Sequence, residues 1–89
     1  MPPQVKYTNV KVYGRDTCPR TMDVRARLER MGVDHEYVEI TRDPSGAAFV
    51  RERAAGRETT PVLDISGDIL VDPDDVTLNN KLQQKGLRR

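Results

Sequence analysis

The sequence has 89 residues, of which 15 are basic and 14 acidic, so its formal net charge at neutral pH is +1. A chain of this length has room for one domain, and we expect residues 1–89 to form a single unit with a small core. The charge balance argues against nucleic acid as the main partner, because phosphate binding needs a clear basic excess or a basic stripe.

Hydropathy and cysteine usage narrow the class of protein further. No stretch approaches the roughly 18 apolar residues of a membrane-spanning helix, and residues 1–4 lack the charged-then-apolar pattern of a signal peptide. Small secreted domains usually form internal disulfides, whereas the single cysteine here cannot form one within the chain. One Cys and one His cannot supply the four ligands of a structural zinc site. We therefore expect a cytoplasmic, monomeric protein with no membrane partner and no metal site.

The first predicted elements are a strand over residues 10–13, which ends at Gly14, and a helix that starts at Pro19. Proline is favoured at the first helical position and glycine just past the last, so Pro19 and Gly32 mark the two ends of this helix. Its apolar residues recur at the spacing of one helix face: Val24, Leu28 and Met31.

A second strand and a second helix follow. Residues 35–40 alternate polar and apolar side chains, which is typical of a half-buried strand. The segment from Pro44 to Gly56 predicts a helix with Asp43 as its N-cap. Because a helix joins the first strand to the second, we expect these strands to be parallel with a right-handed crossover.

The last part of the chain predicts a hairpin and a third helix. Residues 61–65 and 68–71 flank the turn pair Ser66-Gly67. A helix over residues 73–86 is expected to start with Asp72 as its N-cap and to bury three apolar residues: Val76, Leu78 and Leu82. The order β-α-β-α-β-β-α predicts an α/β fold, with three helices on a central four-stranded mixed sheet.

Cys18 lies between the end of the first strand and the start of the first helix. Free amides and the helix dipole meet at such a position, and both favour a thiolate, the attacking species in thiol–disulfide exchange. Charged and hydroxyl side chains that can assist lie on both sides: Arg15, Thr17, Arg20 and Thr21. The other interpretation is a half-buried cysteine used as a small hydrophobe. The strand-to-helix position favours the reactive interpretation.

Two segments resemble the glutaredoxin family. Residues 13–21, Tyr-Gly-Arg-Asp-Thr-Cys-Pro-Arg-Thr, look like its strand, basic residue and Cys-Pro-x-Cys site. Residues 56–61, Gly-Arg-Glu-Thr-Thr-Pro, are similar to its Thr-Val-Pro loop, in which the proline is cis. Gly67 and the pair Asp74-Asp75 match its hairpin turn and the acidic start of its last helix. The resemblance covers nearly the whole chain in order and implies a thioredoxin-like fold.

The resemblance implies an oxidoreductase that performs thiol–disulfide exchange, a form of electron transport. Cys18 would attack a disulfide or glutathionylated protein substrate and accept the glutathionyl group, which a second glutathione would remove. Glutathione or another low-molecular-weight thiol would be the co-substrate, and no bound cofactor is implied.

The resemblance also assigns roles to particular residues. Around the catalytic Cys18, the supporting residues are Thr21, Arg15, Pro19 and Pro61. Those expected to bind glutathione are Arg15, Arg57, Thr60, Pro61, Asp74 and Asp75. Thr21 replaces the family's second cysteine, so only a one-thiol mechanism can operate. Val71-Asp72 stand where the family has two glycines, and their bulk would crowd a bound glutathione.

Two other functions remain open from the sequence. One is binding or transfer of an iron–sulfur cluster by a dimer, with one Cys from each subunit and glutathione as ligands. Pro19 disfavours it, because the one-thiol glutaredoxins of that type have glycine after the cysteine. The other is a thioredoxin-fold module that has lost its chemistry and serves in binding.

Overall fold

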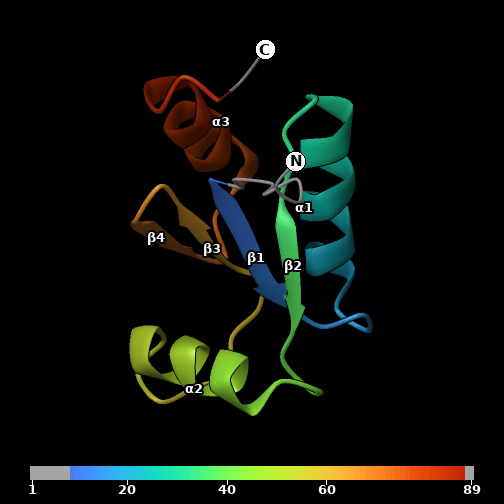
Figure 1. The fold of residues 1–89 in the computed structure, drawn as a ribbon, viewed down its shortest axis with the longest axis vertical. Helices are drawn as coiled ribbons and strands as arrows, with labels where there is room; N and C mark the ends of the chain where they lie inside the picture. The colour runs from blue at the N-terminus through green and yellow to red at the C-terminus, as the bar shows by residue number, and fades with distance from the viewer. Residues whose placement is uncertain (1–8, 88–89) are drawn as a thin grey trace, which may run out of the picture.

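The structure, a computed structural model, describes residues 9–87, so the expectation for residues 1–4 lies outside the described part. The chain forms four strands and three helices in the predicted order (Figure 1). The elements are β1 (Val10–Gly14), α1 (Pro19–Arg30), β2 (Glu36–Glu39), α2 (Pro44–Arg53), β3 (Val62–Ile65), β4 (Asp68–Val71) and α3 (Asp75–Gln84). The predicted thioredoxin-like α/β fold is confirmed.

The four strands form one mixed sheet in the order β2-β1-β3-β4. β1 pairs with β2 in parallel, whereas β3 is antiparallel to both β1 and β4. Tyr13 faces Val62, and Val62 faces Val71, so the end of β1, the start of β3 and the end of β4 share one end of the sheet. Helix α1 also starts at this end, which places Cys18 beside the loops that enter β3 and leave β4.

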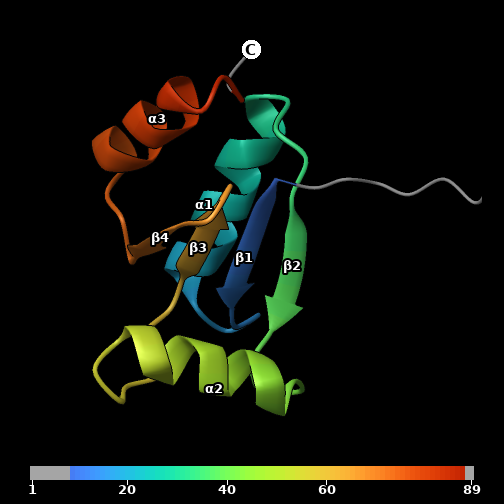
Figure 2. The ribbon, with the colours of Figure 1, turned by 60° about the vertical axis from the view of Figure 1, so that its left-hand side comes forward.

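Alternate residues of the central strands supply two hydrophobic clusters. Val12 and Leu63 are fully buried in the larger cluster, which joins the sheet to α1 and α3. Tyr13 and Val62 point to the other face and pack in the smaller cluster with α2. In Figure 2 the arrowheads of β1 and β2 point toward α2, while α1 runs behind the strands. The sheet is therefore covered by helices on both faces.

The start of α3 differs from the prediction. The helix begins at Asp75, and its N-cap is Asp74, whose carboxylate accepts a hydrogen bond from the amide of Thr77 at 2.7 Å. Asp72 instead has a left-handed backbone, with φ of 44°, and its amide donates to the carbonyl of Pro61. An N-cap residue needs an extended backbone, which Asp74 has and Asp72 lacks, so the helix starts later in the chain.

Val76 was predicted to be buried, and this is wrong. Its side chain is 68% exposed, whereas Leu78 and Leu82 are fully buried. Val76 precedes Leu78 by two residues, which is about 200° around a helix and therefore the opposite face. The buried stripe of α3 is thus the narrow one formed by the two leucines.

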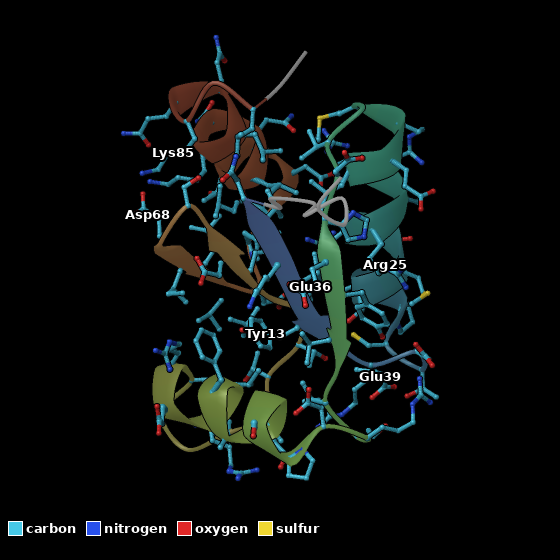
Figure 3. All side chains as sticks on the ribbon, viewed as in Figure 1. Tyr13, Arg25, Glu36, Glu39, Asp68 and Lys85 are labelled. Atoms are coloured by element: carbon cyan, nitrogen blue, oxygen red, sulfur yellow. The ribbon has the colours of Figure 1, made fainter. Side chains whose placement is uncertain are left out.

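The hairpin turn at Ser66-Gly67 is confirmed. Both residues have positive φ, 52° and 94°, which is the backbone of the two-residue turns that suit a twisted hairpin. Asp68, just after the turn, lies 3.1 Å from the ammonium groups of both Lys81 and Lys85, which ties β4 to α3 (Figure 3).

Within residues 9–87, no helix combines the length and the apolar character needed to cross a membrane.

Candidate active site at the start of helix α1

Cys18 is the N-cap residue of α1, and its backbone is extended, with φ of −92° and ψ of 113°. Its amide donates to the carbonyl of Arg15 at 3.0 Å, which closes a tight loop after β1. Pro19 occupies the first helical position, and no side chain caps the first amides of the helix. The first turn also contains no acidic residue. The half-buried sulfur therefore lies at a helix start whose amides no carboxylate occupies.

The environment of the sulfur lowers the pKa of Cys18. Partial burial is the largest single influence and raises that pKa, but hydrogen bonds from the hydroxyls of Thr21 and Thr60 and from the amides of Thr21 and Arg20 together outweigh it. The predicted thiolate-favouring position is thus supported by hydrogen bonds to the anion. The expected help from the charges of Arg15 and Arg20 is reduced, because both guanidiniums are paired with carboxylates.

Thr21 occupies the place where a second cysteine would stand, and its side chain is fully buried. A Cβ on Gly14 would lie 2.3 Å from the methyl carbon of Thr21, so the bare glycine leaves room for this side chain at the end of β1. The hydroxyl oxygen of Thr21 also accepts from the amide of Arg15 at 3.4 Å. The threonine is therefore fixed in place beside Cys18.

The loop before β3 forms the other wall of the site. The Thr60-Pro61 peptide bond is cis, as the resemblance implied, and Pro61 is fully buried. The Sγ atom of Cys18 lies 3.8 Å from the carbonyl oxygen of Thr60. The carbonyl oxygen of Pro61 accepts the amide of Asp72 at 2.8 Å. The cis-proline loop thus contacts both the segment of Cys18 and the segment of Asp72.

Arg15 and Arg51 converge on one carboxylate beside this wall. Nη2 of Arg15 lies 2.8 Å from Oε1 of Glu58, and Nη1 of Arg51 lies 2.8 Å from Oε2 of the same residue. The hydrogen bond from Arg51, followed by that from Arg15, lowers the pKa of the Glu58 carboxyl group. Arg57, which the resemblance also assigns to glutathione binding, is exposed and is not one of the two arginines that hold Glu58.

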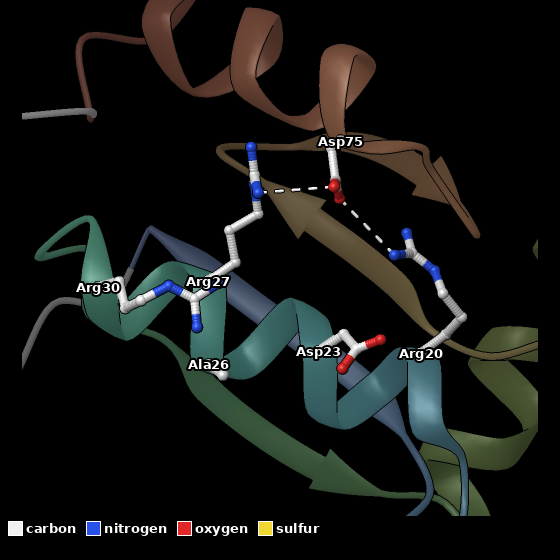
Figure 4. A pocket seen from close by; sticks show the side chains of 6 residues that line it. All are labelled: Arg20, Asp23, Ala26, Arg27, Arg30 and Asp75. Carbon is white, nitrogen blue, oxygen red and sulfur yellow. Dashed lines mark ion pairs between the residues drawn. The ribbon is translucent and has the colours of Figure 1, made fainter.

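Arg20 connects the start of α1 to the segment before α3. Its guanidinium donates to the carbonyl of Pro73 and lies 3.7 Å from Asp72 and 3.6 Å from Asp75. Asp75 also pairs with Arg27 at 3.5 Å (Figure 4). These side chains border a cavity of about 190 Å³ between the two helices. The two carboxylates expected to bind a ligand are exposed but already have partners within the protein: Asp74 caps α3, and Asp75 is shared by two arginines.

The loop that carries Cys18 is held from the side of β2. The amide of Asp16 donates to Glu39 at 2.9 Å, and the carboxylate of Asp16 accepts from Tyr37 and Arg42. Hydrogen bonds from the amide of Asp16 and from Thr41 lower the pKa of Glu39 to about 2. Figure 3 shows Glu39 at the end of β2, at the same end of the sheet as Tyr13.

The structure thus brings most predicted residues together at the sulfur and leaves others apart. Those close to it are Arg15, Pro19, Thr21, Thr60 and Pro61. Asp74 and Asp75 serve α3 and its contacts with α1, while Arg57 is exposed. Sequence reasoning missed Glu58 and Arg51, although Glu58 lies inside the loop that carried the resemblance. Within residues 9–87, no three His, Cys, Asp or Glu side chains are grouped so as to hold a metal ion.

One family model and several solved structures are similar to this chain. Residues 10–70 match the family model described as glutaredoxin, which is more than half of the chain. No curated protein matches the sequence. Among solved structures, a thioredoxin-like protein named BC3987 superposes with a TM-score of 0.77 at 19% identity, over 86% of this chain and 97% of that one.

Two glutaredoxins are also similar in structure. The glutaredoxin of Archaeoglobus fulgidus gives a TM-score of 0.70 at 21% identity, covering 85% of this chain and 87% of its own. A buckwheat glutaredoxin, solved as a complex with glutathione, gives 0.65 at 18% identity, covering 91% and 82%. At such identities the structural likeness shows the fold, and the family model shows the family.

Proposed function

Because this chain belongs to the glutaredoxin family, we propose that it is a one-thiol oxidoreductase in which Cys18 exchanges with mixed disulfides of the glutathione type. The family and the fold support a thiol–disulfide oxidoreductase function in general. The finer proposal adds glutathione, or a similar low-molecular-weight thiol, as the co-substrate. It also limits the mechanism to a single protein sulfur, since Thr21 supplies no second one.

The proposed reaction has two exchange steps. The Cys18 thiolate attacks the glutathione sulfur of a mixed disulfide, so that a bond forms between Cys18 and glutathione. The substrate sulfur leaves as a thiolate and takes up a proton. The thiolate of a free glutathione then attacks the glutathione sulfur on Cys18, which restores the Cys18 thiolate and releases glutathione disulfide. The substrate sulfur is reduced, and the free glutathione is oxidised.

One observation carries the proposal: the sulfur lies at an uncapped helix start, 3.8 Å from the Thr60 carbonyl of the cis-proline loop. The helix amides and two hydroxyls stabilise the attacking thiolate, and hydrogen bonds to the anion lower the pKa of Cys18. The resemblance to the family implies that the backbone of this loop, at Thr60, pairs with the cysteine part of glutathione.

A direct test uses glutathione disulfide and mass spectrometry of the intact protein. We expect one glutathione to be added to the wild-type chain near neutral pH, and none to be added to Cys18→Ser. Free glutathione should then remove the adduct. A wild-type protein that forms no adduct at neutral pH would contradict the proposal.

The two other functions predict different observations. A cluster-binding dimer would develop visible absorbance after reconstitution with iron, sulfide and glutathione. A non-catalytic module would have a Cys18 pKa near its unperturbed value of about 8.5. A titration of the thiol with an alkylating reagent, with and without glutathione, separates these cases from the proposed enzyme, whose thiol should be reactive at neutral pH and protected by the ligand.

A further inference from the structure

The carboxylate of Glu58 lies between two guanidiniums that come from different parts of the fold. Arg15 belongs to the loop after β1, Arg51 to α2, and Glu58 to the loop between α2 and β3. Each carboxylate oxygen is held at 2.8 Å by one arginine, which is the distance of a charge-assisted hydrogen bond. The two arginines thus form a small site for an anion, and the protein's own side chain fills it.

This anion site is adjacent to the reacting sulfur. The carbonyl of Arg15 accepts the amide of Cys18, and Glu58 precedes Thr60, whose carbonyl oxygen is 3.8 Å from Sγ, by two residues. A small disulfide whose sulfur meets Cys18 therefore places its neighbouring groups close to Arg15. If the disulfide carries a carboxylate, that group and Glu58 compete for the same two guanidiniums.

Resting on the proposed exchange at Cys18, we propose that Glu58 acts as an internal competitor for the anion site formed by Arg15 and Arg51. A carboxylate-bearing disulfide must displace Glu58 to bind there, whereas an uncharged disulfide has no such competition. Glu58 is thus a specificity-determining residue that weakens the binding of anionic small disulfides.

The exposure of the three side chains makes this displacement feasible. The side chains of Arg15, Arg51 and Glu58 are 29%, 44% and 42% exposed, so their ion pairs are partly solvated and weak. A ligand carboxylate can therefore replace Glu58 at little cost. Removing the charge of Glu58 leaves two unpaired guanidiniums, and the attraction of the site for an external anion increases.

The test compares Glu58→Gln with Glu52→Gln on two disulfides. Glu52 is a matched control, because it is an exposed glutamate of α2 that pairs with Arg53 and not with the arginines of the anion site. Glutathione disulfide carries carboxylates, and hydroxyethyl disulfide carries no charge. We expect Glu58→Gln to raise the second-order rate constant for adduct formation between Cys18 and glutathione disulfide, measured without free glutathione, about two- to fivefold, with little change for hydroxyethyl disulfide. Glu52→Gln should leave both constants near the wild-type values.

Arg51→Gln tests the other half of the site. It should lower the rate constant of adduct formation for glutathione disulfide more than that for hydroxyethyl disulfide, and the double variant Arg51→Gln/Glu58→Gln should lose most of the gain from Glu58→Gln. The gain should also shrink as salt is added, because exposed charges are screened.

The outcomes separate the inference from the proposed function. If the wild type and every variant fail to exchange with both disulfides, the proposed function fails. If the wild type exchanges with hydroxyethyl disulfide but Glu58→Gln changes both rate constants equally, or neither, the inference of a competing carboxylate is wrong. A selective rise in the rate constant for glutathione disulfide that depends on Arg51 supports it.

Discussion

Helices α1 and α3 start near each other, linked by Arg20, but different groups meet their first free amides. At α3 the carboxylate of Asp74 accepts the amide of Thr77, and Asp75 adds a second negative charge in the first turn. At α1 the N-cap is Cys18, and neither a capping side chain nor an acidic residue is present in the first turn. The capped start stabilises helix α3, whereas the uncapped start of α1 leaves its amides free to stabilise a thiolate.

This difference explains why only one of two similar helix starts is suited to chemistry. A carboxylate at the N-cap uses the amides permanently, since it is ionised at neutral pH. A cysteine uses them only when it loses its proton, so the same amides that would stabilise a helix instead lower the pKa of the thiol. Each of the following predictions changes one side of this comparison, beginning with the largest expected effect.

Cys18→Asp should make the start of α1 resemble that of α3. We expect complete loss of thiol exchange and, because the new carboxylate can cap the helix, a gain of about 0.5–2 kcal/mol in the free energy of unfolding. Denaturant unfolding and the glutathione adduct assay measure the two effects. Loss of activity with lower stability would mean that the amides of α1 are not open to an anion.

Thr21→Val should weaken the support of the thiolate while keeping the shape of the buried side chain. Removal of the hydroxyl should raise the pKa of Cys18, because that hydroxyl donates to the anion. Since the thiolate is the reacting form, the variant should react several-fold more slowly at neutral pH and approach the wild-type rate well above the pKa. A pH profile of alkylation measures this. An unchanged midpoint would exclude Thr21 as a donor.

A paired variant, Thr21→Cys, changes the chemistry at the same position. The second thiol lies one helical turn after Cys18, and we expect an internal disulfide to form under oxidation. Mass spectrometry would then show loss of the glutathione adduct from Cys18 as that disulfide forms. An adduct that persists would mean that the side chain at position 21 cannot reach the sulfur.

Glu39→Gln should loosen the loop that carries Cys18 at the start of α1. The hydrogen bond from the amide of Asp16 and those from Thr41 lower the pKa of Glu39 to about 2. A lowered carboxyl pKa stabilises the fold above the pKa of the unfolded chain, about 4.3, and this stabilisation is lost as pH falls toward 2. Thermal unfolding should show a lower Tm for the variant at neutral pH, with the difference closing in acid. A difference independent of pH would contradict this role.

Arg20→Gln should remove the ion pairs that link the start of α1 to the start of α3. We expect the smallest effect from this variant. Its ion pairs with Asp72 and Asp75 are partly exposed, so we expect a loss of about 1 kcal/mol or less in the free energy of unfolding. The loss should diminish in high salt. Arg30→Gln is the matched control, because Arg30 borders the same cavity from the same helix. Equal losses in the free energy of unfolding in the two variants would mean that Arg20 has no specific role in linking the two helices.

Local signals in the sequence were sufficient for most of the fold. Proline at the start and glycine after the end placed α1 and α2, and Ser66-Gly67 placed the hairpin. The start of α3 was misplaced because both Asp72 and Asp74 are good N-cap residues. The choice between them depends on the amide of Asp72 pairing with Pro61, eleven residues earlier in the chain. No local pattern contains that contact.

The sequence by itself determined that one cysteine stands at the start of a helix, because proline, glycine and strand patterns act over short distances. Only the tertiary structure decided what surrounds that sulfur. The contact with Thr60, the pairing of Arg15 and Arg51 with Glu58, and the use of Asp75 by Arg20 all join segments that are far apart in the chain or belong to different elements. Charged side chains take whichever partner the packing brings near, so their roles follow from the fold rather than from their neighbours in sequence.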